Sequence, residues 1–256
     1  MASNAESVLH DLVEMSHSLG QPERDLVILG EGNTSALNDD GTFWVKASGT
    51  ELRTIDEQGF VRVRLEAVCA LADRENLSDE EVKAALEAAK VDPSATRRPS
   101  VETVLHALAL AEAGAKFVGH THSVAVNALA CSNGLTAAVS GRLFPDEIVV
   151  CGPAPIYVPY TDPGLPLARA VRAGFRRYAD EWGEPPKVVL MQNHGLIALG
   201  ASARHVDNIT AMYVKVCRIL AGTFTFGGPH FMTPAQVRRI HTRPDELYRR
   251  KQLGIG

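Results

Sequence analysis

The chain has 256 residues, of which 45% are hydrophobic and 22% charged, and its formal net charge is -4. A chain of this length can bury a full core, so we expect a single domain over residues 1–256, with 224–256 as a C-terminal extension. No long basic run forms the clustered cationic face that nucleic acids require, and no apolar stretch reads as a bilayer span. We therefore expect neither a nucleic-acid partner nor a membrane partner.

The first residues lack the basic start and apolar core of a secretory signal. The cysteines lie far apart and form no C-x-x-C pair; they are Cys69, Cys131, Cys151 and Cys217. This pattern indicates neither a zinc knuckle nor a disulfide framework. We expect reduced thiols in a cytoplasmic protein.

Apolar residues recur at helical or strand spacing along most of the chain. In chain order, the expected elements are helix 3–19, strands 26–29, 42–47 and 60–65, helices 78–90 and 98–113, strand 115–122, helix 124–130, strand 148–150, helix 167–182, strands 188–191 and 196–199, and helices 203–220 and 234–241. Asp40-Gly41 indicates a hairpin turn, and Ser78 with Glu81 is typical of a capping box. Residues 153–166 read as an irregular loop.

Two short glycine-containing stretches, 30–35 and 46–50, offer unhindered backbone N–H groups. The first is not a dinucleotide fingerprint, because it lacks a third glycine and no helix follows it directly. Asn33, Thr34 and Ser35 in one stretch, and Lys46 with Ser48 in the other, could cradle an anion. Each stretch alone is a weak signal, and an ordinary turn is the alternative interpretation.

Three histidines in strand and turn contexts are the clearest chemical signal. His120 and His122 are two residues apart in an apolar strand, so their side chains share one face. His194 follows a second apolar strand, in a turn at its end. A lone histidine on a strand is usually a hydrogen-bonded core residue, but three imidazoles in these contexts favour a metal site.

Glu102 begins the helix expected from residue 98 and lies four residues before His106. A carboxylate at a helix start commonly interacts with the helix dipole. The functional alternative is a general acid or base beside the metal, since enzymes tune glutamate for that role.

The ordered motifs Gly-x-Gly-Asn-Thr-Ser, Ser-Gly-Thr, Pro-Ser-x-Glu, His-x-His and Asn-His-Gly resemble those of the class II aldolase/adducin family, over residues 26–220. This family includes fuculose-1-phosphate and rhamnulose-1-phosphate aldolases and ribulose-5-phosphate 4-epimerase. The resemblance implies an α/β fold, with one αβα-layered domain around a central, largely antiparallel sheet. It also implies a homotetramer with sites between subunits.

The resemblance assigns His120, His122 and His194 as ligands of a divalent metal, usually zinc, and Glu102 as the catalytic carboxylate. It places Asn33, Ser48, Gly49 and Ser100 around the substrate phosphate. The sequence departs from the family where Val101 replaces a second serine, which removes a phosphate donor. Either Lys46 or an arginine compensates, or the substrate carries no phosphate.

The resemblance implies a metal-dependent lyase that cleaves a small ketose or ketose phosphate in a reversible aldol reaction, through a metal-stabilised enediolate. Alternatives on the same site are a sugar-phosphate 4-epimerase and a keto-acid phosphate decarboxylase. The alternative from another class is an adducin-like assembly protein without catalysis, and the three histidines count against it. The extension resembles that of uncharacterised members near a bifunctional aldolase/dehydrogenase group.

Aldol chemistry also needs a group that exchanges a proton with the aldehyde-derived oxygen, a role suited to tyrosine. The sequence does not rank the candidates, which are Tyr157, Tyr160, Tyr213 and Tyr248.

Overall fold

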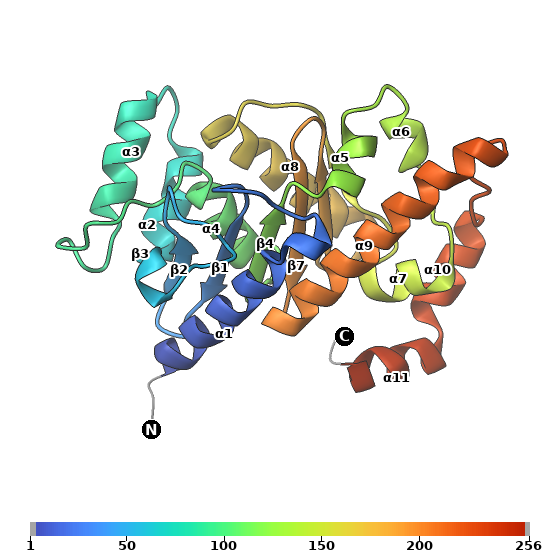
Figure 1. The fold of residues 1–256 in the computed structure, drawn as a ribbon, viewed down its shortest axis with the longest axis horizontal. Helices are drawn as coiled ribbons and strands as arrows, with labels where there is room; N and C mark the ends of the chain where they lie inside the picture. The colour runs from blue at the N-terminus through green and yellow to red at the C-terminus, as the bar shows by residue number, and fades with distance from the viewer. Residues whose placement is uncertain (1–3, 254–256) are drawn as a thin grey trace.

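The computed structural model describes residues 4–253 and has a seven-stranded sheet with helices on both faces (Figure 1). The strand order is β3-β2-β1-β4-β7-β6-β5, and every pairing is antiparallel except the parallel pair β5 and β6. The strands are β1 (Asn33–Leu37), β2 (Thr42–Lys46), β3 (Phe60–Arg64), β4 (Phe117–Thr121), β5 (Ile156–Val158), β6 (Val188–Met191) and β7 (Gly195–Gly200). This is the expected α/β fold with a largely antiparallel sheet.

The α-helices lie before the first strand, between strands and after the last strand. They are α1 (Asn4–Leu19), α2 (Leu65–Cys69), α3 (Asp79–Ala88), α4 (Thr103–Glu112), α5 (Val124–Ala130), α6 (Leu135–Ala138), α7 (Pro145–Cys151), α8 (Leu165–Trp182), α9 (Ala203–Thr223), α10 (Pro234–Thr242) and α11 (Pro244–Leu253). Figure 1 shows α1 and α9 crossing in front of the sheet, and α4 and α8 behind it.

Successive side chains along the central strands point to opposite faces of the sheet, and a hydrophobic core lies on each face. Val189 and Ile197 point into the core beneath α2, α3, α4 and α8. Their neighbours Val188 and Leu196 point into the core beneath α1, α5 and α9. Because both faces are covered, β6 and β7 are apolar along their whole length rather than alternately polar.

Two predicted strands are wrong. Residues 26–29 form no strand, and Leu29 has a positive φ of 51°. The strand at this point of the chain is instead β1, which includes Asn33 and Ser35 from the predicted anion cradle. Residues 148–150 lie in helix α7, which begins at Pro145.

Helix α9 and the turn after it form a 24-residue segment that is apolar and long enough to cross a membrane by length and composition. The expectation that no such stretch exists was therefore wrong. Val206, Ile209 and Leu220 of this helix are buried against the sheet and its neighbouring helices. That packing is typical of a core helix in a globular domain.

The C-terminal extension packs on the body through a small apolar cluster. Val237 and Ile240 of α10 meet Ile148 and Val149 of α7. Thr233 and Gln236 form a capping box at the start of α10. Helix α11, which the sequence pattern did not predict, follows at Pro244.

Candidate metal centre and adjoining cavity

Strand pairing brings the three histidines to one end of the sheet. β4 lies beside β7, and Thr121 pairs with Leu196, so the end of β4 meets the turn that carries His194. The imidazole rings are 4.8 to 5.1 Å apart between centroids. One ligand atom from each of His120, His122 and His194 lies within 4.8 Å of the other two. The His-x-His spacing thus places both rings on one side, as the strand period predicts.

The turn at His194 is fixed from helix α5. Asn193 adopts a positive φ of 53°, and its N–H donates to the carbonyl of Ala130 (3.0 Å). The side-chain amide of Asn127 donates to the carbonyl of His194 (3.1 Å). Asparagine tolerates the left-handed conformation better than most residues, which explains its position before the histidine.

Gly195 allows the two strands to approach closely behind the histidines. A Cβ atom at this position would lie 2.4 Å from the carbonyl oxygen of Thr121 and 3.0 Å from the His122 ring. Any side chain at residue 195 would therefore push β7 away from the His120 and His122 pair.

The histidine donors fit a divalent metal. Nδ1–H of His120 donates to the carbonyl of Leu196 (3.0 Å), which leaves Nε2 as the lone-pair nitrogen facing the other two rings. Burial lowers the pKa of His120 and His122 to about 4, so both rings are neutral at neutral pH. Neutral imidazoles with fixed tautomers are the form that binds metal ions.

Glu102 lies against this triad. It occupies the position before the first residue of α4, without a capping hydrogen bond from its side chain, and is only 9% exposed. Its Oε1 is 3.2 Å from Nε2 of His194 and 3.6 Å from Nε2 of His120. The side-chain amide of Asn33, which pairs with His120 across β1 and β4, donates to Oε2 at 2.5 Å. Burial opposes the charge of Glu102, but His120, His194 and His106 outweigh burial and hold its pKa well below the usual range.

The expected phosphate contacts come from two neighbouring loops. The N–H of Ser48 donates to the carbonyl of Arg98 (3.0 Å), and Ala47 bridges to Pro99, so Ser48 and Gly49 lie beside the segment that carries Ser100. Gly49 has a φ of 79°. The hydroxyl of Ser100 is buried and has no hydrogen-bond partner among residues 4–253. This arrangement is compatible with the predicted role of these residues in phosphate binding.

Lys46 is buried at the end of β2, where its ammonium donates to the carbonyl of Gly30 (3.1 Å). Burial lowers its pKa, and the negative charge of Glu102 partly offsets that effect. Lys46 therefore lies close enough to Glu102 to interact with its charge.

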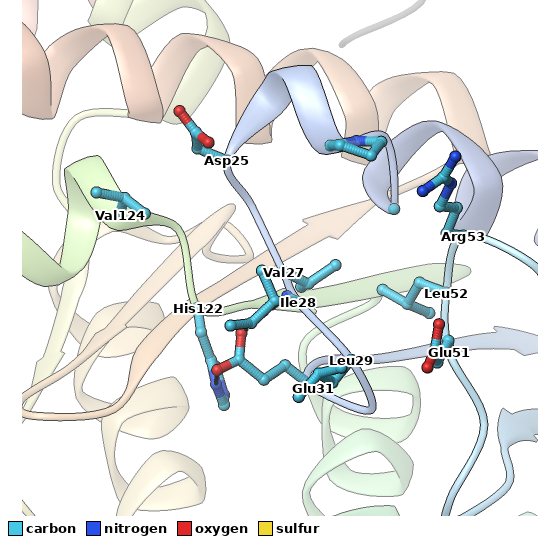
Figure 2. A pocket seen from close by; sticks show the side chains of 12 residues that line it. Asp25, Val27, Ile28, Leu29, Glu31, Glu51, Leu52, Arg53, His122 and Val124 are labelled. Carbon is cyan, nitrogen blue, oxygen red and sulfur yellow. Dashed lines mark hydrogen bonds and ion pairs between the residues drawn. The ribbon is translucent and has the colours of Figure 1, made fainter.

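A cavity of about 400 Å³ adjoins the triad at His122 (Figure 2). Val27, Ile28 and Leu29 line one side, and Glu31 points its carboxylate toward His122, 3.8 Å from Nδ1. Sequence reasoning missed the 26–29 segment as part of the site, because its apolar run was taken for a strand. It also missed Glu31, because the 30–35 stretch was considered only for its anion-binding groups.

A second missed residue is His106, which is fully buried on α4. Its Nδ1 forms a 2.7 Å hydrogen bond with the Ser35 hydroxyl on β1, and burial lowers its pKa to about 4. The four-residue spacing between Glu102 and His106 was a signal that could have identified it.

The four candidate tyrosines differ in their burial and in their hydrogen-bond partners. Tyr213 is 2% exposed within the core beneath α9, and Tyr248 is exposed on α11. The Tyr157 hydroxyl donates to the side-chain oxygen of Gln192 (2.9 Å), two residues before His194. The backbone N–H of Tyr160 also donates to Gln192 (3.4 Å). Tyr157 and Tyr160 are therefore the candidates with a hydrogen bond to the turn that carries His194.

Comparison with known proteins agrees with this geometry. The chain is 30% identical over 203 residues to the uncharacterized oxidoreductase YuxG of Bacillus subtilis, covering 76% of this chain and 27% of that protein. It is 28% identical over 206 residues to methylthioribulose-1-phosphate dehydratase of Microcystis aeruginosa, covering 75% of this chain and 85% of that protein. The chain therefore spans about a quarter of the first relative and most of the second.

Solved structures show the same fold. The N-terminal class II aldolase domain of a conserved protein from Thermoplasma acidophilum has 27% identity and a TM-score of 0.67, covering 86% of this chain and 97% of that chain. An L-fuculose 1-phosphate aldolase has 19% identity and a TM-score of 0.69, covering 94% and 96%. Residues 10–221 match the protein-family model of the Class II Aldolase and Adducin N-terminal domain. With its histidine triad at the end of a sheet of this fold, the chain belongs to the class II aldolase and adducin family.

Proposed function

We propose that the protein is a zinc-dependent lyase that cleaves a carbon–carbon bond of a small ketose or ketose phosphate by retro-aldol chemistry. The observation that carries this proposal is the Glu102 carboxylate, held 3.2 Å from His194 and 3.6 Å from His120 at the edge of the histidine triad. A divalent metal ion held by the triad supplies a Lewis acid that stabilises negative charge on substrate oxygens.

Glu102 is placed to move the proton of the reaction. In the condensation direction Glu102, as a carboxylate, accepts a proton from the nucleophilic carbon. In the cleavage direction its protonated form donates a proton to that same carbon, while the substrate hydroxyl at the breaking bond gives its proton to a second base. Asn33 fixes the other carboxylate oxygen, so Oε1 is the atom that faces the triad. Ser48, Gly49 and Ser100, with Lys46 nearby, hold the phosphate of a phosphorylated substrate in this proposal.

The dehydratase relative favours a second candidate function, the elimination of water from a ketose 1-phosphate. Both reactions move a proton at the carbon next to a carbonyl, and this chain offers Glu102 for either. Dehydration removes the proton from that carbon and then breaks a carbon–oxygen bond, whereas aldol cleavage breaks a carbon–carbon bond and then adds a proton to that carbon.

One experiment tests both functions. The zinc-loaded protein is incubated with fuculose 1-phosphate, rhamnulose 1-phosphate and methylthioribulose 1-phosphate, and with the same sugars without phosphate, and products are identified by mass spectrometry. Two fragments indicate aldol cleavage, whereas one product lighter by one water indicates dehydration. The His194→Ala variant should lose both the metal, measured by elemental analysis, and turnover. Protein that binds no metal after reconstitution would contradict both functions and favour an adducin-like role.

We also propose a homotetramer with a neighbouring subunit beside the catalytic cavity. Ile28 is 68% exposed and Leu29 is 75% exposed at its rim, and a second subunit would cover them. Light scattering on the purified protein measures the assembly state, and a monomer at micromolar concentration would contradict the proposal.

A further inference from the structure

A second cavity lies at the opposite end of the sheet from the histidines. Strand β7 begins at Gly195 next to His194 and ends at Gly200, which lines this cavity, so the two sites are about 17 Å apart at roughly 3.3 Å per residue. The cavity measures about 560 Å³. Its walls come from residues 113–115 and 184–187, the start of α9, and α11, which Figure 1 shows below the sheet.

The charged residues that line this cavity are mostly cationic. Lys187, Arg250 and Lys251 face it, against the single carboxylate of Glu184. That carboxylate already contacts Nε2 of His241 at 3.1 Å. Burial together with the charge of Arg250 lowers the pKa of Lys187 to about 8, so the two cations are close enough to disfavour each other. The residues that line the cavity therefore carry a net positive charge.

Two buried donors in this wall lack a protein acceptor. His205 is 6% exposed, and its Nδ1 accepts the N–H of Ala201 (3.3 Å), which places the proton of the neutral ring on Nε2. Arg250 is also 6% exposed and contacts Nδ1 of His241 through Nη2 (3.1 Å). Within the described residues, neither Nε2 of His205 nor Nε of Arg250 has a hydrogen-bond partner. Buried donors without acceptors are rare in proteins, and a bound ligand is one explanation for them.

We propose that this cavity binds the phosphate group of a small organic phosphate, at a site separate from the metal centre. A phosphate monoester carries close to two negative charges at neutral pH and three acceptor oxygens. The net positive charge of the lining residues would attract such a group, which would accept hydrogen bonds from Lys187, His205 and Arg250. Inorganic phosphate alone would leave most of the volume empty.

The rest of the wall suits the organic part of such a ligand. Pro185, Pro186, Leu199 and Leu247 supply apolar surface beside the donors. Binding sites for small metabolites commonly combine apolar walls with a few convergent polar groups. Leu247, Arg250 and Lys251 belong to α11, so a bound phosphate would link the C-terminal extension to the body of the domain.

The test measures binding of glycerol 3-phosphate to the metal-loaded protein by titration calorimetry. Because Ser48 and Ser100 are candidate phosphate contacts near the metal, a Ser48→Ala/Ser100→Ala double variant provides the background. In that background we expect saturable binding, weakened at least tenfold by Arg250→Met and separately by Lys187→Met. The matched control is Arg249→Met, which alters an exposed arginine on the same helix that pairs with Asp146; this change should leave the affinity intact.

Glycerate, which carries a carboxylate on a similar body, tests the ligand class and should bind at least tenfold more weakly than glycerol 3-phosphate. Circular dichroism and the melting temperature establish that each variant is folded. Equal binding in the folded Arg250→Met and Lys187→Met variants and in the background would overturn the proposal, as would tighter binding of glycerate. Because the readout is binding, its failure is distinguishable from failure of the proposed lyase activity.

Discussion

Glu102 experiences opposing influences on its charge. Burial favours the neutral acid, whereas His120, His194 and His106 favour the carboxylate and keep its pKa well below the usual range. The protein therefore holds Glu102 ionised beside the triad at neutral pH, which is the form that its proposed role as a proton acceptor requires.

The Glu102→Gln variant should lose activity but keep its metal, because glutamine preserves the shape of the side chain and cannot accept the proton. We expect kcat to fall by roughly 10² to 10⁴, the typical range for losing a general base. Steady-state kinetics and elemental analysis measure the two effects. The control is Glu112→Gln on the same helix, which removes an exposed carboxylate paired with Arg172. Full activity in Glu102→Gln would contradict the proposed role.

The buried hydrogen bond between Ser35 and His106 joins β1 to α4 behind Glu102. Ser35→Ala removes the hydrogen-bond partner of Nδ1 of His106, a side chain that is fully buried. We expect the free energy of unfolding to fall by about 1 to 3 kcal/mol, measured by urea denaturation. Ser140→Ala serves as control, because Ser140 is exposed and bonds only the carbonyl of Ala137. An equal loss in both variants would show that the bond contributes nothing particular.

The residue types and spacing predicted most of this site, and three-dimensional placement supplied the rest. His-x-His in a strand determines the side on which both rings lie, because side chains alternate along a strand. The hydrogen bonds from Asn33 to Glu102 and from Tyr157 to Gln192 depend on which strands are neighbours. A single sequence carries no signal for those pairings, so the four tyrosines could not be ranked from it.

At the scale of elements, β4 and β7 can approach each other closely because residue 195 is a glycine, which has no side chain to separate them. Gly195→Ala should reduce zinc affinity about 10- to 100-fold, the usual effect of disturbing groups that orient metal ligands. Competition with a fluorescent zinc chelator measures the change. Gly222→Ala is the matched control, since a Cβ atom there meets nothing within 4 Å in α9. Undiminished zinc affinity in Gly195→Ala would show that β7 can shift without moving the ligands.

Helices with a recognisable capping sequence were predicted well, whereas the secondary structure of short apolar runs was not. The capping box at Ser78 and Glu81 is present at the start of α3, and α5 has the predicted bounds. Residues 148–150 are Ile-Val-Val, which suits a strand or a buried helix equally. Pro145 followed by Asp146 and Glu147 is a helix-start signal that should have decided for a helix.

At the scale of the whole molecule, buried histidines link stability to pH. Burial lowers the pKa of His106 to about 4, and burial with the charge of Lys187 does the same for His205. Between pH 6.5 and 4 the unfolded chain binds protons at these rings and the folded chain does not. Stability should therefore decrease as pH falls through this window.

From pH 6.5 to pH 5 we expect a loss of up to roughly 2 kcal/mol for each histidine, at 1.4 kcal/mol per proton and pH unit. Urea denaturation of the metal-free protein at several pH values measures the slope. His106→Gln removes one of the titrating groups. The slope of its free energy of unfolding against pH should therefore correspond to about one proton fewer than in the wild type. A wild-type stability that stays constant across this range would contradict the prediction.

The metal centre also bears on how the chain folds. His122 and His194 are more than seventy residues apart in the sequence, and they meet only when β7 pairs with β4 across the intervening helices. Closing such a long loop is entropically costly and slow compared with forming local turns and helices. Tight metal binding therefore has to wait until the centre of the sheet is assembled. In a refolding experiment, the visible absorption of cobalt bound at the triad would report the formation of that long-range pairing directly.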